Sequence, residues 1–366
     1  MSFSPDYLLS QLHRQPGMAC YRVAFSGGLD SHVLLHALCQ LRDRLDAEIG
    51  AVHVNHGLQP VANDWVTHCR SVCADLDVPF ISLLVDGRAL PGESPEAAAR
   101  AARYAALADW LPANNCLLTA QHQDDQAETL LLQLLRGSGV SGLAAMPRSA
   151  TLGAGCHLRP LLDVRREELR DYALAQSLTW IEDPSNADTA FDRNFLRQRV
   201  LPVLQRRWPS AAVSLSRSAA HCAEAAELLD ALAGEELQAL MSSENSLSLT
   251  ALLAMPALRQ RNVLRHWIKQ LTGTSPSAAV LARIINDVIG SRPDSGPCVR
   301  WDCYEMRRYR RELFLLPQAL PGSPAGALDW VLARPLTLPR AGGVLTADPV
   351  TGSGLRADAV AAGNVR

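Results

Sequence analysis

Hydrophobic and polar positions alternate with two different periods between residues 20 and 137. Short, nearly continuous apolar runs predict buried strands, and the stretches between them carry apolar residues at helical spacing. The predicted strands are YRVAF (21–25), IGAVHVN (49–55), FISLLV (80–85), CLLTA (116–120) and, further on, CHLRPLL (156–162). The predicted helices cover 30–42, 62–76, 95–110 and 124–136. This alternation predicts an α/β fold in which helices cover both faces of a doubly wound parallel sheet.

The pattern changes after about residue 210. One strand-like segment lies at 298–316, and the stretches with helical spacing are 211–241, 249–271 and 276–290. Towards the end of the chain, many prolines and glycines stand among short apolar runs, which predicts the opening of a further, β-containing unit. We therefore expect three parts: an α/β domain at 1–210, a mainly helical domain at 211–316, and an incomplete C-terminal segment at 317–366.

Composition narrows the class of protein without identifying it. With 48% hydrophobic and 20% charged residues the chain is ordinarily globular, and no apolar run is long enough to cross a membrane. The net charge of −2 gives no general sign of nucleic-acid binding, although arginine supplies every basic side chain except Lys269. Nine cysteines are scattered without a Cys-x-x-Cys pair, and the N-terminus does not resemble a secretory signal. These features predict a cytoplasmic protein with free thiols.

The segment AFSGGLDSHVLL (24–35) joins a predicted strand to a predicted helix through two glycines. Gly27 and Gly28 let the backbone turn sharply and approach a ligand closely. The N–H groups of such a loop and of the helix N-terminus attract anions, and serine hydroxyls add further donors. The segment therefore predicts a phosphate site made by Ser26, Gly27, Gly28, Leu29, Asp30 and Ser31.

This loop lacks the lysine with which Gly-x-x-x-x-Gly-Lys-Ser/Thr loops hold the β- and γ-phosphates for γ-phosphoryl transfer. A cradle of backbone donors instead suits a pyrophosphate that stays in place as the leaving group. Attack would then fall on the α-phosphorus of ATP and produce an adenylate. Because the Asp30 carboxylate would repel phosphates, the sequence also predicts Mg²⁺ bound at Asp30.

The stretch TAQHQDDQAETLLLQLLRGSGVSGLAAM (119–146) gathers a histidine and three carboxylates within seven residues. Acidic side chains in the first turn of a helix ordinarily complement the helix dipole, and this alternative stays open. Their position at the same sheet edge as the phosphate loop favours catalysis, either as ligands of Mg²⁺ or as the general base that an attacking amine requires. The catalytic candidates are Asp30, His122, Asp124, Asp125 and Glu128.

Two more histidines, His53 and His56, stand at the end of the second predicted strand in AVHVNHGL (51–58). Side chains at the carboxyl end of a parallel strand lie at the mouth of an α/β site. Capping or core roles for the two imidazoles remain the alternative. The sequence therefore places them near the site without assigning them a role.

The motif Ser-Gly-Gly-x-Asp-Ser at 26–31 resembles the fingerprint of the N-type ATP pyrophosphatases, the PP-loop family, which adenylate a carbonyl-type oxygen and then admit a nucleophile. Within that family the chain resembles the tRNA(Ile)-lysidine synthetases over about residues 20–210. The segments that carry this resemblance are VHVNHGL, EAAARAARYAAL, the 119–146 stretch, RPLL and EDPSNADTAFDRNFLRQRVLPVL. It continues more loosely to about residue 316, where WDCYEMRRYRRELFLLP is similar to the end of that family's middle domain.

The resemblance implies an adenine nucleotide alpha hydrolase-like fold and a ligase that uses ATP and Mg²⁺. Such an enzyme adenylates O2 of the wobble cytidine in a CAU-anticodon tRNA(Ile), and free L-lysine then displaces AMP to form lysidine. The family pattern Ala-Arg-x-x-Arg-Tyr matches Arg100 and Arg103, which implies contacts with the ATP phosphates or the lysine carboxylate, and packing against neighbouring acids is the alternative. The identity of the general base and the oligomeric state, a homodimer included, stay open.

Two basic segments predict contacts with RNA phosphates. The first, RNFLRQRVLPVLQRR (193–207), carries five arginines and no acid, and a solvated helix face is its alternative role. The second surrounds Tyr309 and suits a contact with an RNA stem. The candidates for tRNA binding are Arg193, Arg197, Arg199, Arg206, Arg207, Arg307 and Arg308.

Two other functions remain possible at this point. A PP-loop tRNA thiolation enzyme would need catalytic cysteines or an iron–sulfur Cys-x-x-Cys, and the sequence has no such pair. A non-catalytic module that binds nucleotide and tRNA would gain nothing from the carboxylates at 122–128. Both alternatives explain less of the sequence than ATP-dependent lysidine synthesis does.

Overall fold

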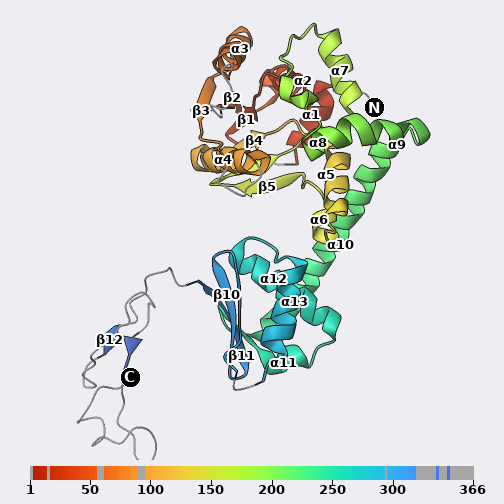
Figure 1. Ribbon diagram of the computed structural model, residues 1–366. Helices are drawn as coiled ribbons and strands as arrows, with labels where there is room; N and C mark the ends of the chain where they lie inside the picture. The colour runs from red at the N-terminus through yellow and green to blue at the C-terminus, as the bar shows by residue number, and fades with distance from the viewer. Residues whose placement is uncertain are drawn as a thin grey trace, which may run out of the picture. The chain divides into compact units, whose positions relative to one another are not determined.

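A computed structural model describes residues 3–14, 17–55, 62–88, 95–292, 295–318, 335–337 and 344–346 (Figure 1). The chain divides into two compact units, Met1–Ala233 and Gly234–Arg366. The domain limit expected at residue 210 lies at the start of helix α10 (Ala211–Leu240), whereas the limit between the two compact units falls inside this helix. Within the described ranges, no helix is both long and apolar enough to span a membrane.

The first unit is built on a six-stranded sheet of order β3-β2-β1-β4-β6-β5. The strands from β3 to β6 in this order pair in parallel, as the alternating pattern predicts. The edge strand β5 is antiparallel to β6, which the sequence analysis did not predict. The strands are β1 (Cys20–Ala24), β2 (Glu48–Asn55), β3 (Phe80–Leu84), β4 (Asn115–Leu118), β5 (Ser149–Leu152) and β6 (Gly155–Leu158).

Helices cover both faces of this sheet, so the doubly wound architecture is confirmed. Alternate side chains of the strands point to opposite faces, and each face has its own core. Val23 and Ala51 belong to the core shared with α1, α2, α3 and α7, whereas Val52 packs with Leu107 of α4 on the other face. The helices are α1 (Pro5–Leu12), α2 (Leu29–Cys39), α3 (Ala62–Asp75), α4 (Pro95–Trp110), α5 (Gln123–Leu135), α6 (Val140–Leu143) and α7 (Arg166–Ala175).

The order of the strands in the sheet determines where the ligand crevice lies. The chain runs outward from β1 through β2 to β3 and then returns to β4 on the other side of β1. In open α/β sheets the ligand lies at such a switch point, outside the carboxyl ends of the two strands. The phosphate loop follows β1, and the stretch rich in carboxylates follows β4. The two segments that the sequence singles out are therefore brought together.

A basic helix in three parts follows the α/β core: α8 (Asp192–Phe195), a π-helical turn (Leu196–Val200) and α9 (Leu201–Arg207). The interruption has a cause in the sequence. Pro202 has no N–H to donate to the carbonyl four residues earlier, and its ring crowds that turn. A widened turn accommodates both effects. The predicted basic helix over 193–207 is thus present, with Arg197 on the widened turn.

The second unit contains a five-stranded antiparallel sheet of order β7-β8-β11-β10-β9 together with helices α11 to α13. The single strand expected at 298–316 is three strands, because the chain turns at Asp302 and Arg310, both with positive φ. Its strands are β7 (Met241–Ser243), β8 (Ser246–Ser248), β9 (Cys298–Trp301), β10 (Tyr304–Tyr309) and β11 (Glu312–Pro317). Its helices are α11 (Leu249–Leu253), α12 (Ala257–Thr272) and α13 (Ala278–Arg283), and a π-helical turn (Ile284–Ile289) follows α13.

Of the β-containing segment expected at 317–366, the structure describes little. Strands β12 (Leu336–Thr337) and β13 (Val344–Leu345) form a short antiparallel pair. The remainder of that prediction, beyond Gln318, lies outside the described residues.

Candidate active site

A cleft of about 1760 Å³ opens at the carboxyl ends of β1 and β4. It collects residues that are far apart in the chain, from the phosphate loop, the carboxylate stretch, α4 and the basic helix. The predicted site residues that line it are Ser26, Gly28, Leu29, Asp30, Ser31, Arg100, Arg103, Asp124, Asp125, Glu128, Arg193 and Arg197. One cleft therefore contains most of the residues expected to bind ATP and to catalyse.

Hydrogen bonds to its own serine hydroxyl groups stabilise the conformation of the phosphate loop. Ser31 Oγ accepts from the Ser26 N–H at 3.3 Å and donates to the Gly28 carbonyl at 3.0 Å. Ser26 Oγ in turn accepts from the Gly28 N–H at 3.3 Å. Gly27 adopts a φ of 81°, and a Cβ at this position would come 3.0 Å from Cys69 Sγ. The loop conformation therefore depends on both serines and on glycine at position 27.

Neighbouring strands and segments support the loop from behind. His53 Nδ1 lies 2.9 Å from the Phe25 carbonyl, and the Ile181 N–H donates to the Gly27 carbonyl at 2.9 Å. Burial lowers the pKa of His53, so this imidazole is a neutral partner of the backbone. Of the two histidines considered at the site mouth, His53 thus has a structural contact, and His56 lies outside the described residues.

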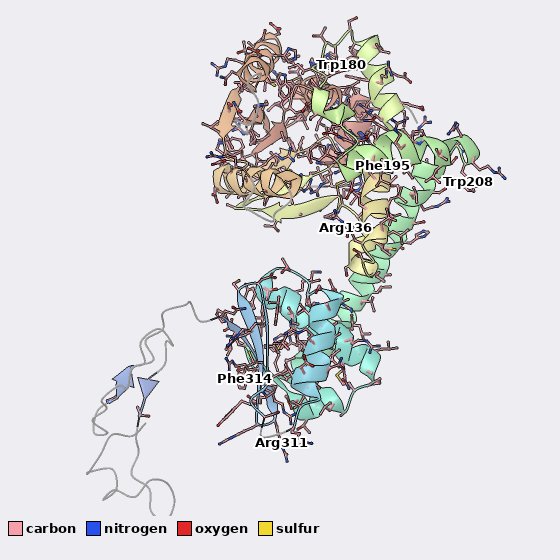
Figure 2. All side chains as sticks on the ribbon, viewed as in Figure 1. Arg136, Trp180, Phe195, Trp208, Arg311 and Phe314 are labelled. Atoms are coloured by element: carbon pink, nitrogen blue, oxygen red, sulfur yellow. The ribbon has the colours of Figure 1, made fainter. Side chains whose placement is uncertain are left out.

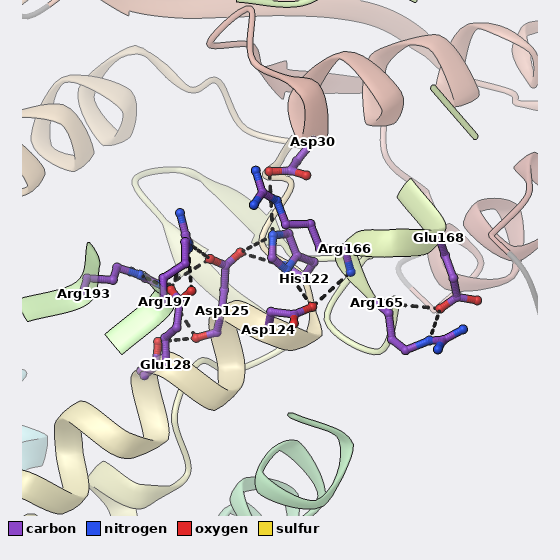
Figure 3. Close-up of polar contacts among 11 residues, drawn as sticks. Asp30, His122, Asp124, Asp125, Glu128, Arg165, Arg166, Glu168, Arg193 and Arg197 are labelled. Carbon is purple, nitrogen blue, oxygen red and sulfur yellow. Dashed lines mark hydrogen bonds and ion pairs between the residues drawn. The ribbon is translucent and has the colours of Figure 1, made fainter. Parts of the chain in front are cut away.

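Three carboxylates surround the buried imidazole of His122 (Figure 3). Its Nε2 lies 3.7 Å from Asp30 Oδ2 and 3.4 Å from Asp125 Oδ2. Its Nδ1 lies 3.7 Å from Asp124 Oδ2. The backbone N–H of His122 also donates to Asp125 Oδ2 at 3.0 Å, and this hydrogen bond caps the start of α5. His122 therefore links the carboxylate of the phosphate loop to the carboxylates of α5.

Glu128 and Asp125 hold two arginines of the basic helix against α5, as the dashed contacts in Figure 3 show. The Arg193 Nε donates to Glu128 Oε2 at 2.8 Å, and the Arg197 Nε donates to Glu128 Oε1 at 2.6 Å. Arg197 Nη2 also reaches Asp125 Oδ1 at 3.0 Å. Glu128 is fully buried. We call Asp125, Glu128, Arg193 and Arg197 the arginine–carboxylate cluster.

The carboxyl groups of Asp30 and Asp125, which both lie beside His122, have pKa values shifted in opposite directions. Burial raises the pKa of Asp30, although His122 and Arg166 partly oppose this effect. Burial also acts to raise the pKa of Asp125, but His122, Arg193 and Arg197 outweigh it and the pKa of this carboxyl falls below its ordinary value. The ion pairs of Asp125 therefore stabilise its charged form, whereas the effect of burial outweighs that of the nearby cations at Asp30.

Asp30 fits the Mg²⁺ that the sequence predicts. Its Oδ1 is buried and has no hydrogen-bond partner among the described residues. Those residues contain no group of three or more His, Cys, Asp or Glu arranged to hold a metal ion. Mg²⁺ at nucleotide sites usually takes one or two carboxylates, with phosphates and waters as the other ligands. A single carboxylate beside a phosphate loop meets that requirement.

The remaining basic candidates have different surroundings. Arg100 and Arg103 line the cleft and flank the ring of Tyr104, with guanidinium carbons 5.0 and 5.9 Å from its centroid. In the second unit, the Arg307 Nε donates to Glu305 Oε1 at 2.6 Å, and the Arg308 Nη1 donates to the Ser291 carbonyl at 2.7 Å. Both therefore have partners within the protein, and their contact with RNA stays a prediction.

The contribution of α7 to the cleft was not predicted from the sequence. Arg165, Arg166 and Arg170 line it, and the Arg166 N–H donates to Asp124 Oδ2 at 3.0 Å. Helix α7 is strongly charged and buries only Leu169 and Ala173, so it offers few apolar residues as a helix signal. The run of charged residues after the last predicted strand was the signal available in the sequence.

The sheet topology, the lysine-free phosphate loop and the carboxylates beside it define an ATP pyrophosphatase of the PP-loop class. Residues 5–204 match the PP-loop domain family, and residues 247–314 match the TilS substrate binding domain. The chain belongs to the tRNA(Ile)-lysidine synthase family.

Curated relatives support this assignment over nearly the whole chain. The tRNA(Ile)-lysidine synthase of Methylococcus capsulatus is 45% identical over 100% of this chain and 83% of its own length. Those of Coxiella burnetii and Serratia proteamaculans are 43% and 47% identical over 97% and 91% of this chain, and over 79% and 77% of their own lengths. Among solved structures, the U34-tRNA thiolase NcsA from Methanococcus maripaludis aligns with a TM-score of 0.50 at 16% identity, over 60% of this chain and 78% of that one, which shows a shared fold.

Proposed function

We propose that this enzyme joins free L-lysine to the wobble cytidine of tRNA(Ile) with a CAU anticodon, through an adenylated cytidine, and releases AMP and pyrophosphate. One observation carries the proposal: the lysine-free phosphate loop lines the same cleft as the three carboxylates around His122, which are Asp30, Asp124 and Asp125. The loop suits α-phosphorus attack by the cytidine oxygen, and the cluster suits deprotonation of the amine that follows.

On the ATP side, the hydroxyls and N–H groups of the phosphate loop would hold the pyrophosphate while the bond to the α-phosphorus breaks. Asp30 would hold Mg²⁺ through its buried Oδ1. The metal, when bound, would neutralise phosphate charge and stabilise the leaving pyrophosphate. Arg100 and Arg103 on α4 supply guanidinium groups suited to phosphate or to the lysine carboxylate.

Among the acidic candidates, Asp124 is the best placed to accept the proton of the lysine amine. Both oxygens of Glu128 accept from guanidinium groups, and Asp125 is committed to His122 and Arg197. Asp124 lines the cleft, stands 3.7 Å from His122 Nδ1 and shares its Oδ2 with one backbone N–H. The structure therefore favours Asp124 as base and a positioning role for Glu128.

A pyrophosphate-release assay tests the proposed function. We expect release that depends on ATP, Mg²⁺ and a CAU-anticodon tRNA, and conversion of the adenylated tRNA to a lysine-containing product when lysine is added. Mass spectrometry of the nucleosides would identify that product. A sulfur-containing nucleoside formed with a sulfur donor, and no lysine adduct, would support a thiolation enzyme instead. Light scattering would measure the oligomeric state, which the sequence leaves open, and cell fractionation would test the expected cytoplasmic location.

The outward side of the basic helix is a proposed contact for the tRNA backbone. Arg199, Arg206 and Arg207 are exposed, unlike the two arginines of the arginine–carboxylate cluster. Arg207 stacks 5.8 Å from the ring centre of Trp208, which is 58% exposed at the far end of α9 (Figure 2). Exposed aromatic rings beside guanidinium groups suit RNA.

Substituting Arg206 and Arg207 together with alanine should weaken tRNA binding and reduce the slope of log affinity against log salt by about two. Filter binding at several salt concentrations measures both quantities. The Arg42→Ala/Arg44→Ala variant is the matched control, because these exposed arginines pair with Asp77 and Asp6 on the same unit. Equal slopes in the two double variants would remove α9 from the RNA contact.

A further inference from the structure

His157, Thr119 and Gln121 form a chain of polar contacts that leads from the protein interior to the cleft. Thr119 lies just beyond β4, where its N–H donates to the Leu158 carbonyl of β6 at 3.1 Å. Thr119 and His157 are 6% and 2% exposed, and Thr119 Oγ1 lies 2.7 Å from His157 Nε2. The Thr119 hydroxyl also donates to Gln121 Oε1, and Gln121 lines the cleft.

The hydrogen-bonding capacity of each group gives this chain a direction. An amide oxygen only accepts, so the single proton of the Thr119 hydroxyl is used on Gln121. The threonine oxygen must then accept from His157, whose ring proton is therefore on Nε2. Burial and the nearby Arg159 and Arg100 lower the pKa of His157 to about 3, so the ring is neutral and has one proton to place. With its oxygen occupied, Gln121 can offer the cleft its amide N–H groups.

We infer that His157 and Thr119 are positioning residues that make Gln121 a committed hydrogen-bond donor to a ring-nitrogen acceptor of a nucleobase in the cleft. This inference rests on the proposed function for the identity of the bases. Several guanidinium groups line the cleft, among them those of Arg100, Arg165 and Arg166, and these suit the phosphate or carboxylate groups of a ligand. A neutral amide adds little to such anions, but it suits a neutral acceptor.

A committed donor has a consequence for base selection. N3 of cytosine accepts a hydrogen bond, whereas N3 of uracil carries a proton that would meet the amide N–H. A site built to donate leaves a buried polar group unpaired when the acceptor is missing, and rejects such a ligand strongly. The adenine of ATP also presents ring-nitrogen acceptors. Both candidates share the same chemistry, and the experiment below separates them.

Three variants test the inference. Thr119→Val keeps the shape and removes the hydroxyl, Thr119→Ser keeps the hydroxyl, and Gln121→Glu replaces the amide N–H groups with an acceptor oxygen. The measurements are kcat and KM for ATP, lysine and tRNA, with thermal melting as the check on folding. We expect the valine and glutamate variants to raise the KM of ATP or of tRNA about tenfold. The KM of lysine should stay within about twofold, and the serine variant should behave like wild type.

The same variants show which base is bound. A raised KM for tRNA, with weaker discrimination against a tRNA whose wobble cytidine is changed to uridine, identifies cytosine. A raised KM for ATP with unchanged tRNA kinetics identifies adenine. Equal losses in the serine and valine variants, a rise confined to lysine, or unchanged kinetics in Gln121→Glu would overturn the inference. If Thr119→Val fails to fold, the Gln121→Glu variant provides the test, because Gln121 is only partly buried and lines the cleft.

The outcome can be told apart from failure of the proposed function. Calorimetric binding of ATP and of an anticodon stem-loop to the full chain requires no ligation. Weaker binding of one of them to Gln121→Glu would uphold the inference even if the wild-type protein formed no lysidine. Unchanged binding of both, in a wild-type protein that does form lysidine, would overturn the inference and leave the proposed function standing.

Discussion

Replacing Asp30 with asparagine should abolish adenylation, by at least about a hundredfold, without destabilising the free protein. The carboxyl's raised pKa sets the direction of the stability effect. An acid with a higher pKa in the folded than in the unfolded protein favours folding only while it is protonated, and this advantage is lost as the pH rises through the folded pKa. At neutral pH the buried charge opposes folding, and asparagine removes it.

Pyrophosphate release and differential scanning calorimetry measure the two effects separately. The Asp30→Asn variant should melt at the same temperature as wild type or higher at pH 7, and this gain should disappear at low pH. Asp46→Asn is the matched control, since Asp46 is exposed on the same unit. Pyrophosphate release near the wild-type rate in Asp30→Asn would remove the carboxylate from the reaction and from the proposed Mg²⁺ site.

Glu128→Gln should cause a large loss of stability in the first unit. Glu128 is fully buried and accepts from both Arg193 and Arg197, whose side chains are 23% and 29% exposed. Removing one member of a buried ion pair costs about 3 kcal/mol, because the remaining charges stay desolvated without a partner. For a unit of this size that corresponds to a melting temperature lower by about 10 °C. Activity should fall as well, because the two arginines lose their fixed position at the cleft.

The matched control for this variant is Glu167→Gln. Glu167 pairs with Arg165 at 3.8 Å and its side chain is 85% exposed, so its loss should cost less than about 1 kcal/mol. Combining Glu128→Gln with Arg193→Gln should cost less than the sum of the two single changes, since both single changes break the same Arg193–Glu128 ion pair. A Glu128→Gln protein that melts within a degree of wild type would show that the cluster contributes little to folding.

Features that depend on local spacing were predictable from the sequence. The strands and helices around the phosphate loop follow from apolar runs, and Gly27 follows from a turn that requires positive φ. By contrast, helix α7 was not predicted, because charged residues dominate it and only Leu169 and Ala173 are buried. The turn at Arg310 was not predicted, because arginine is not a residue typical of turns with positive φ.

The partners of the charged side chains were not predictable in the same way. Arg193 and Glu128 are 65 positions apart, and their contact depends on how the basic helix packs against α5. An arginine run without acids reads locally as an RNA contact, because its carboxylate partners lie on another element. Glu128, a catalytic candidate in the sequence, likewise has its arginine partners on another element, and its role in catalysis stays a prediction. The sequence showed which groups carry charge, and the fold determines which charges neutralise one another.

The arginine-rich wall of the cleft also bears on side reactions. The first unit contains no lysine, since the chain's only one is Lys269. A guanidinium group stays protonated at any physiological pH and is a poor nucleophile, whereas a partly desolvated amine attacks activated carbon readily. Arginines can thus bind phosphates at the cleft without competing for the activated cytidine. The α/β unit holds no ε-amine of its own, so no lysine side chain of this unit can compete with free lysine for the activated cytidine.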